Sequence, residues 1–220
     1  MNPPSTHIKL MIAEERCIIL QSLVALCRTF KNMEVIATAR NGEEWMQKLE
    51  TARPEIIITG IQMPFRDGFE STRAINEKLP WIKVIVLSVY DHPAYVKKLL
   101  KIGVRGFISK NASENELEKA IISVFNGDIY LSQEISRSII NDFSDPTGST
   151  IIQNYNSLTF REIQIIQLLS DGFYTREIAE KLFISPKTVE RHKTNILKKL
   201  NLRNTAHLVK MAIQNGLIMT

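Results

Sequence analysis

The 220-residue sequence has few cysteines and no long uncharged apolar stretch. No apolar run approaches the roughly 18 residues that a transmembrane helix needs, and the start MNPPSTHIKLMIAEE lacks the segments of a secretory signal. The only two cysteines, Cys17 and Cys27, are ten residues apart in one predicted helix, about 15 Å along its axis and too far for a disulfide. We therefore expect a cytoplasmic protein without a membrane partner, in which both cysteines are small apolar helix residues rather than redox or metal groups.

Net charge is absent from the first two thirds of the chain. Residues 1–145 contain 18 Lys and Arg against 18 Asp and Glu, whereas residues 146–220 contain 10 against 5, so the whole net charge of +5 lies in the last part. A basic module joined to a neutral one favours a nucleic-acid partner. A small basic domain that is merely well solvated would have the same charge balance.

Strand and helix patterns alternate over the first 126 residues. Runs rich in β-branched residues predict strands over 7–13, 33–39, 55–59, 82–88 and 104–109. Amphipathic segments that follow each strand predict five helices, the first over 16–30. The expected fold class is therefore α/β, a five-stranded doubly wound parallel sheet of the flavodoxin-like kind, in a domain of residues 1–130.

The carboxyl ends of the predicted strands mark a candidate ligand crevice, because doubly wound sheets bind ligands at that edge. The residues placed there are Glu14, Glu15, Gly60, Ser88 and Lys110. Gly60 is unexpected at this position. A buried strand of this kind often delivers a reactive side chain to a pocket, but the last residue here has no side chain.

The rest of the chain is predicted to be helical. Residues 131–157 are expected to form a short helix, Ser132 to Phe143, and a linker rich in turn-forming residues, followed by an all-α domain over 158–220. Helix starts are indicated by Thr159 with Glu162, by Thr175, by Ser185 before Pro186, and by Asn204 or Thr205. The helix from Pro186 is basic on one side and apolar on the other, which is typical of the second helix of a helix-turn-helix. Such a helix fits the major groove of DNA, and a solvated basic helix is the alternative.

Residues 158–218 resemble the LuxR-type helix-turn-helix domain in the motifs LT-x-RE, TREIA-x-KL-x-IS, KTV-x-x-H-x-x-NI-x-KL and GLI. The resemblance implies a domain that binds double-stranded DNA as a homodimer, with the helix from Pro186 as its recognition helix. It implies base contacts for Glu190, Arg191 and Thr194 and positions near phosphates for Arg176, Lys187, Thr188 and Lys198. The dimerisation helix of the family corresponds to Leu208, Val209 and Ala212, although part of that apolar stripe must be core.

Two residues of the recognition helix depart from the family pattern. Glu190 stands where Lys is common, so we expect an altered base preference, since a carboxylate accepts a hydrogen bond from the N4 amine of cytosine. Lys193 stands where a small apolar residue is common and is expected to add a phosphate contact.

Residues 8–130 resemble the receiver domain of two-component response regulators in the NarL/FixJ arrangement, through IKLMIAEE, EIIITGIQMPFRDG, VIVLSVYD and GFISK in that order. The family has a phosphorylated aspartate at the position of Gly60, and glycine offers no nucleophile. Glu14 and Glu15 replace the acidic pair that holds Mg²⁺ in the family, so no cofactor is expected and Mg²⁺ binding should be weak or absent. The phosphate-contacting hydroxyl and amine of the family remain as Ser88 and Lys110, and Phe107 occupies its aromatic switch position.

Two explanations for the retained Ser88 and Lys110 stay open. Lys110 pairs with Glu14 or Glu15 and locks the domain in one state, or the pocket accepts an anion or small ligand in place of acyl phosphate. Asp67 is a conceivable substitute acceptor, but its place at a helix start already explains it as a cap.

The sequence as a whole predicts a transcription regulator and not an enzyme: an atypical response regulator that binds DNA as a dimer without aspartyl phosphorylation. Its activity would depend on its abundance, a partner protein or a small ligand. Three rival hypotheses are a conventional phospho-switched regulator with another acceptor, an interaction protein that sequesters a related regulator, and an enzyme with a flavodoxin-like nucleotide site. The enzyme is disfavoured because EERCII, and no Gly-rich phosphate loop, follows the first strand.

Overall fold

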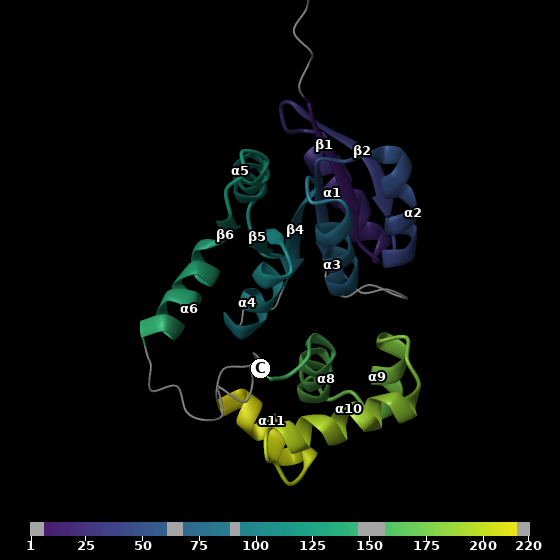
Figure 1. Cartoon of the computed structure of the whole chain (residues 1–220), viewed down its shortest axis with the longest axis vertical. Helices are drawn as coiled ribbons and strands as arrows, with labels where there is room; N and C mark the ends of the chain where they lie inside the picture. The colour runs from purple at the N-terminus through teal and green to yellow at the C-terminus, as the bar shows by residue number, and fades with distance from the viewer. Residues whose placement is uncertain (1–6, 61–67, 89–92, 145–156, 215–220) are drawn as a thin grey trace, which may run out of the picture. The chain divides into compact units, whose positions relative to one another are not determined.

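The computed structural model describes residues 7–60, 68–88, 93–144 and 157–214 (Figure 1). The chain divides into two compact units, the first made of residues 1–91 and 96–136 and the second of residues 92–95 and 137–220. The first contains the sheet and is called the sheet unit below, and the second contains the C-terminal helices and is called the helical unit. Among the described residues, no helix combines the length and apolar character that crossing a membrane requires.

Six parallel strands form one sheet in the order β2-β1-β3-β4-β5-β6. Their bounds are β1 (Ile8–Ala13), β2 (Met33–Ala39), β3 (Ile56–Gly60), β4 (Lys83–Ser88), β5 (Val104–Ser109) and β6 (Tyr130–Leu131). The first five lie within one residue of the predicted ranges, but the prediction of five strands was wrong. The sixth has two residues, paired with Gly106 and Phe107 of β5, which is too short to leave a periodic pattern in the sequence.

A helix follows each of the first five strands, as predicted. These are α1 (Cys17–Cys27), α2 (Gly42–Ala52), α3 (Gly68–Lys78), α4 (Pro93–Lys101) and α5 (Glu114–Phe125). Helices α1 and α5 cover one face of the sheet, where Leu20 and Ile121 pack with Leu10 and Ile58. Strand residues of the opposite parity, such as Ile57, are also completely buried, so both faces are covered, as in a doubly wound sheet.

Helix α1 is shorter than the predicted 16–30. It ends at Cys27, where the Thr29 hydroxyl donates to the carbonyl of Leu26 at 2.7 Å and satisfies one of the carbonyls at the helix end. Cys17 and Cys27 are both free thiols, as predicted. Cys27 is buried and burial raises its pKa to about 12, whereas Cys17 is exposed and is not part of the core.

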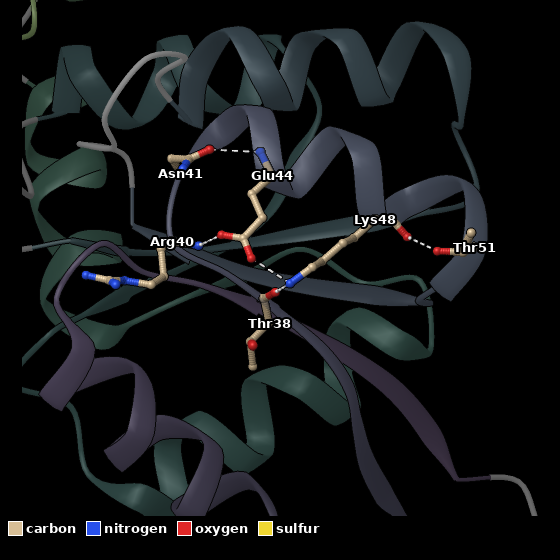
Figure 2. Close-up of polar contacts among 6 residues, drawn as sticks. All are labelled: Thr38, Arg40, Asn41, Glu44, Lys48 and Thr51. Atoms are coloured by element: carbon tan, nitrogen blue, oxygen red, sulfur yellow. Dashed lines mark hydrogen bonds and ion pairs between the residues drawn. The ribbon is translucent and has the colours of Figure 1, made fainter.

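The start of α2 shows how local sequence fixes a helix end (Figure 2). The side-chain oxygen of Asn41 accepts a hydrogen bond from the backbone N–H of Glu44 at 2.8 Å, as the spacing predicted. The Glu44 carboxylate accepts from the backbone N–H of Arg40 at 2.7 Å and from Lys48 Nζ at 2.6 Å. Lys48 also donates to the carbonyl of Thr38 at 2.8 Å, which ties the helix to β2.

After β6, helix α6 (Gln133–Ser144) agrees with the helix predicted over Ser132 to Phe143. The predicted linker, apart from Ser157, lies outside the described residues. Four helices then follow, α8 (Phe160–Ser170), α9 (Thr175–Lys181), α10 (Pro186–Lys199) and α11 (Thr205–Gln214). Apolar side chains from all four share one core, which includes Ile165, Ile178, Val189, Ile196 and Leu208.

The start of α8 forms as predicted. Thr159 and Glu162 form a complete capping box, in which each side chain accepts a hydrogen bond from the backbone N–H of the other, at 3.3 and 2.6 Å.

The start of α10 also forms as predicted: the Ser185 hydroxyl accepts from the Thr188 N–H at 3.1 Å, with Pro186 at the first helical position. At the start of α11 the side chain of Asn204 accepts from the His207 N–H at 2.8 Å.

The predicted cap of α9 was wrong. Thr175 is the first residue of the helix and not its cap, and the Glu177 carboxylate accepts from the backbone N–H of Tyr174 at 2.7 Å. The hydroxyl of Thr175 is therefore available for a contact outside its own helix.

Candidate regulatory pocket and nucleic-acid interface

The strand ends of the sheet unit bring the predicted pocket residues together. Gly60 is the last residue of β3 and pairs with Leu87 of β4, and Ser88 ends β4. Lys110 directly follows β5, and its backbone N–H donates to the Ser88 carbonyl at 2.9 Å. Glu14 follows β1, which neighbours β3 in the sheet. Glu14, Gly60, Ser88 and Lys110 thus lie at one edge of the sheet.

Lys110 and Glu14 form an ion pair across this edge, with Lys110 Nζ 2.8 Å from Glu14 Oε2. The other oxygen, Oε1, accepts from the backbone N–H of Arg16 at 3.2 Å. The Glu14 side chain is only 4% exposed and that of Lys110 is 28% exposed. Of the two explanations for Lys110, the structure thus contains the pairing with a glutamate, with Glu14 as the partner.

The ion pair spans the ends of two strands, because β3 and β4 lie between β1 and β5. A β-carbon at Gly60 would lie 3.3 Å from Glu14 Oε2 and 4.0 Å from Lys110 Nζ. Gly60 belongs to an extended strand, so its backbone conformation does not require glycine. The absence of a side chain instead leaves room for the Glu14 carboxylate to reach Lys110.

The same carboxylates do not fit a magnesium site. Mg²⁺ requires near-octahedral oxygen ligands at about 2.1 Å. Both oxygens of Glu14 already accept hydrogen bonds, and Gly60 supplies no side-chain ligand. Throughout the described ranges, no three His, Cys, Asp or Glu side chains gather as a metal site would need.

The remaining predicted pocket residues lie in different surroundings. Phe107 is completely buried in β5, so its ring is part of the core. Ser88 is also buried, at the end of β4. Asp67, considered as a substitute acceptor and as a cap, lies outside the described residues.

In the helical unit, α10 buries one side and exposes the other. Val189 and Ile196 face the core, whereas Lys187, Arg191 and Lys198 are exposed, as is Thr194. Arg176 of α9 is exposed as well. None of these four cations makes an ion pair within the part of the chain that the structure describes. The predicted interface is thus basic and accessible, although Thr188 is half-buried and its hydroxyl lies 2.8 Å from that of Ser185.

Glu190 and Lys193 behave differently from the other predicted interface residues. Glu190 Oε1 accepts a hydrogen bond from the Thr175 hydroxyl at 2.6 Å and pairs with Lys193 Nζ at 2.9 Å. The Thr175 hydrogen bond, followed by that of Lys193, holds the pKa of the Glu190 carboxyl below its usual value. Lys193, predicted as a phosphate contact, is therefore bound to Glu190. Sequence reasoning missed this role of Thr175, because a threonine at a helix start is typical of a cap.

An ion pair with a buried carboxylate connects two helices of this unit. Lys199 Nζ of α10 lies 2.7 Å from Glu162 Oε2 of α8, which is also the capping-box residue. Burial raises the pKa of Glu162, but the hydrogen bonds from Lys199 and Thr159 lower it by more, so the pKa lies below its usual value. Arg161 donates to the carbonyl of Leu182, at the end of α9. The two adjacent residues Arg161 and Glu162 of the LT-x-RE motif therefore have structural roles.

The predicted dimerisation residues of α11 do not share one side of the helix. Leu208 and Ala212 are completely buried in the core of a single chain, in agreement with the expectation that part of the stripe is core. Val209 is half-buried and lines an apolar surface together with the exposed Ala206 and Ile213. Helix α11 thus has two apolar stripes, one buried in the core with Leu208 and Ala212 and one on the surface with Ala206, Val209 and Ile213. Only the surface stripe is accessible to a partner.

The two units match two known protein families. Residues 10–122 match the response regulator receiver domain, and residues 156–212 match the luxR family of bacterial regulatory proteins. The chain is 34% identical over 215 residues to the oxygen regulatory protein NreC of Staphylococcus carnosus (strain TM300), which covers 96% of this chain and 99% of that protein. NreC of Staphylococcus epidermidis (strain ATCC 12228 / FDA PCI 1200) is 33% identical over 216 residues, with the same coverage.

Solved structures show the same fold over nearly the whole chain. The response regulator ChrA of a heme-sensing two-component system is 30% identical, with a TM-score of 0.53, and the match covers 97% of this chain and 100% of that chain. RcsB from Salmonella enterica serovar Typhimurium, bound to promoter P1flhDC in the presence of the phosphomimetic BeF3-, is 22% identical with a TM-score of 0.68, covering 94% and 99%. The chain therefore belongs to the DNA-binding response regulators of NarL/LuxR type, a family of transcriptional regulators and not of enzymes.

Proposed function

We propose that this protein regulates transcription as a DNA-binding dimer without phosphorylation at the end of β3. The observation that carries the proposal is Gly60, which provides no nucleophile at the position where the family has its phosphorylated aspartate. The pocket around it is adapted to this loss, because Glu14 neutralises Lys110 without a ligand.

The Glu14–Lys110 pair favours one fixed state of the sheet unit. An incoming anion would have to displace a carboxylate that is almost completely buried and hydrogen-bonded through both oxygens. Removing the partner of a buried charge is strongly unfavourable. Activity is then set by the amount of protein, by a partner protein, or by a small ligand that binds elsewhere.

The helical unit supplies the DNA-binding surface and part of the dimer. Exposed Lys187, Arg191 and Lys198 lie on the side of α10 that faces away from the core, as a helix in the major groove requires. The apolar surface of Ala206, Val209 and Ile213 on α11 is the surface that we propose for the contact between two copies.

Site selection from random-sequence DNA with the untreated full-length protein tests this proposal. We expect enrichment of two half-sites about one helical turn apart. The logarithm of the affinity should fall linearly with the logarithm of the salt concentration, with a slope near −0.9 for each phosphate contact. Enrichment that appears only after a phosphodonor is added would contradict the proposal.

Sequestration of a related regulator is the second candidate function. It is favoured by Glu190, which places a carboxylate on the surface that would face DNA phosphates. In that case the untreated protein would enrich no sequence, its weak DNA binding would change little with salt, and it would form heterodimers with the related regulator.

A further inference from the structure

A cluster of three polar side chains joins the two helices of the helix-turn-helix. Thr175 is the first residue of α9, and Glu190 and Lys193 lie one helical turn apart near the middle of α10. The Thr175 hydroxyl and the Lys193 ammonium both contact the same oxygen, Glu190 Oε1, at 2.6 and 2.9 Å. Lys193 Nζ also lies 3.3 Å from the Thr175 hydroxyl, so the three groups contact one another and fix the carboxylate.

The second oxygen of Glu190 is left as an acceptor. Oε2 makes no hydrogen bond or ion pair among the residues that the structure describes, and the Glu190 side chain is 55% exposed. By contrast, the side chain of Lys193 is only 18% exposed. The arrangement therefore presents an oriented carboxylate oxygen to the surroundings while its counter-ion stays inside.

Lys193 also removes the electrostatic objection to a carboxylate at this position. An isolated negative charge on a recognition helix would be repelled by the phosphates of DNA. Here the charge of Glu190 is balanced by an ammonium 2.9 Å away, and the exposed cations Lys187, Arg191 and Lys198 stay available for phosphates.

An ionised carboxylate accepts hydrogen bonds and donates none, which restricts the bases that it tolerates. In the major groove, cytosine offers the N4 amine as a donor, whereas guanine offers two acceptors. Adenine offers its N6 amine beside the acceptor N7, which repels a carboxylate, and thymine offers an acceptor and a methyl group. Cytosine is therefore the base that fits best.

We propose that Thr175, Glu190 and Lys193 act as one base-reading unit that selects cytosine at one position of each half-site. Glu190 is the specificity-determining residue, and Thr175 and Lys193 are positioning residues that hold its carboxylate. The proposal depends on the entry of α10 into the major groove, which is part of the proposed function.

The test is a competition experiment with the full-length protein and the selected DNA site, in which each base of a half-site is varied in turn. For the unmodified protein we expect one position at which cytosine is preferred about 5- to 150-fold over the other bases. In E190A this preference disappears and those at other positions remain. In E190Q it moves toward adenine, because a side-chain amide pairs with both N6 and N7 of that base.

The positioning residues are tested by T175V and K193M. Both variants should weaken the cytosine preference at the same position several-fold and leave the salt dependence unchanged, whereas T175S, which keeps the hydroxyl, should restore the preference. K198M is the matched control, since loss of an exposed cation should lower the affinity equally for all bases and reduce the salt slope by about 0.9. If K193M behaves like K198M, Lys193 contacts phosphate and the base-reading unit is wrong.

Two results separate this inference from the proposed function. If the protein binds its site tightly and E190A leaves every base preference unchanged, the inference is overturned and the proposed function stands. If the unmodified protein enriches no DNA sequence, both are overturned. Far-UV circular dichroism checks that each variant folds, and E190A and E190Q should fold because Glu190 is exposed.

Discussion

The sheet unit and the helical unit each contain a Lys–Glu pair at the position where a ligand is expected, but the two pairs are buried in opposite ways. In the sheet unit the carboxylate of Glu14 is 4% exposed and Lys110 is the more exposed partner, at 28%. In the helical unit Lys193 is the less exposed partner, at 18%, and Glu190 is 55% exposed. The first pair closes a site, whereas the second presents a carboxylate to a ligand.

The Glu162–Lys199 pair shows which of these patterns is structural. Its carboxylate is 2% exposed and its lysine 33%, as in the pair of Glu14 and Lys110, and it connects α8 to α10. The similarity supports the interpretation of Glu14 and Lys110 as a structural pair. The predictions below test this comparison by removing one member of each arrangement, from the largest expected effect to the smallest.

The largest loss of stability is expected for E162A, because it removes both a capping box and the partner of Lys199. We expect the free energy of unfolding of the helical unit to fall by about 2–5 kcal/mol, of which about 0.5–2 comes from the lost cap and about 1.5–3 from the lost hydrogen bond of the charged Lys199. Both tryptophans, Trp45 and Trp81, lie in the sheet unit. Urea unfolding followed by far-UV circular dichroism should therefore show an early transition that tryptophan fluorescence does not detect. Coincident, unshifted transitions would contradict this.

The same carboxylate gives the helical unit a pH dependence. Because the pKa of Glu162 is lowered in the folded state, its stabilisation is present above the ordinary carboxyl pKa of about 4.3 and is lost as the pH falls through the folded-state pKa. Below about pH 4, the wild-type protein should lose stability more steeply than E162Q, which has no titrating group there. Equal slopes for the two proteins would show that Glu162 is not responsible.

The two stripes of α11 are distinguished by L208A and V209E. Leu208 is completely buried, so L208A should lower the free energy of unfolding by about 2–5 kcal/mol. Val209 lies on the apolar surface, so V209E should change stability by less than about 1 kcal/mol and weaken self-association and binding to two half-sites. Urea denaturation measures the stability of the two variants, and sedimentation equilibrium measures their self-association. Unchanged self-association of V209E would place the dimer contact elsewhere.

The closed pocket of the sheet unit is tested by K110M, which leaves Glu14 buried without a countercharge. The buried Glu14 carboxylate loses one partner and keeps the Arg16 N–H, so we expect a loss of about 1–3 kcal/mol in the free energy of unfolding, measured by tryptophan fluorescence in urea. The double variant E14Q/K110M should recover part of this loss, because no buried charge remains. A K110M protein as stable as the wild type would show that the pair contributes nothing.

The smallest effect is chemical and leaves stability unchanged. Exposed Cys17 should react with a thiol reagent in the native protein, whereas Cys27, buried and with a pKa of about 12, should react only on unfolding. Mass spectrometry after brief labelling should find one modified cysteine. Two modified cysteines in the native state would indicate that the region around α1 opens readily.

Elements with a repeated pattern could be predicted from the sequence, because periodicity and caps are local signals. The first five strands and the caps Asn41, Thr159 and Ser185 follow from such signals. The two-residue β6 and the contact of Thr175 with Glu190 could not be predicted in this way. They depend on which segments the tertiary fold places side by side, and no spacing along the chain indicates this.

The candidate sites show the same limit. The sequence offered the pairing of Lys110 with Glu14 or Glu15 as one of two explanations, and the choice of Glu14 depends on the space that Gly60 leaves beside the carboxylate. An amphipathic stripe indicated that α11 has an apolar side, yet it did not separate the buried Leu208 from the surface of Val209. Burial in the folded unit makes that separation.

Regulation without phosphorylation at the β3 position is tested most directly by incubating the full-length protein with acetyl phosphate and Mg²⁺. Intact-mass measurement should detect no added phosphoryl group, and the affinity for the selected DNA site should equal that of untreated protein at each salt concentration. A stoichiometric phosphoryl adduct that tightens DNA binding would contradict the account and show that another residue of the chain serves as the acceptor.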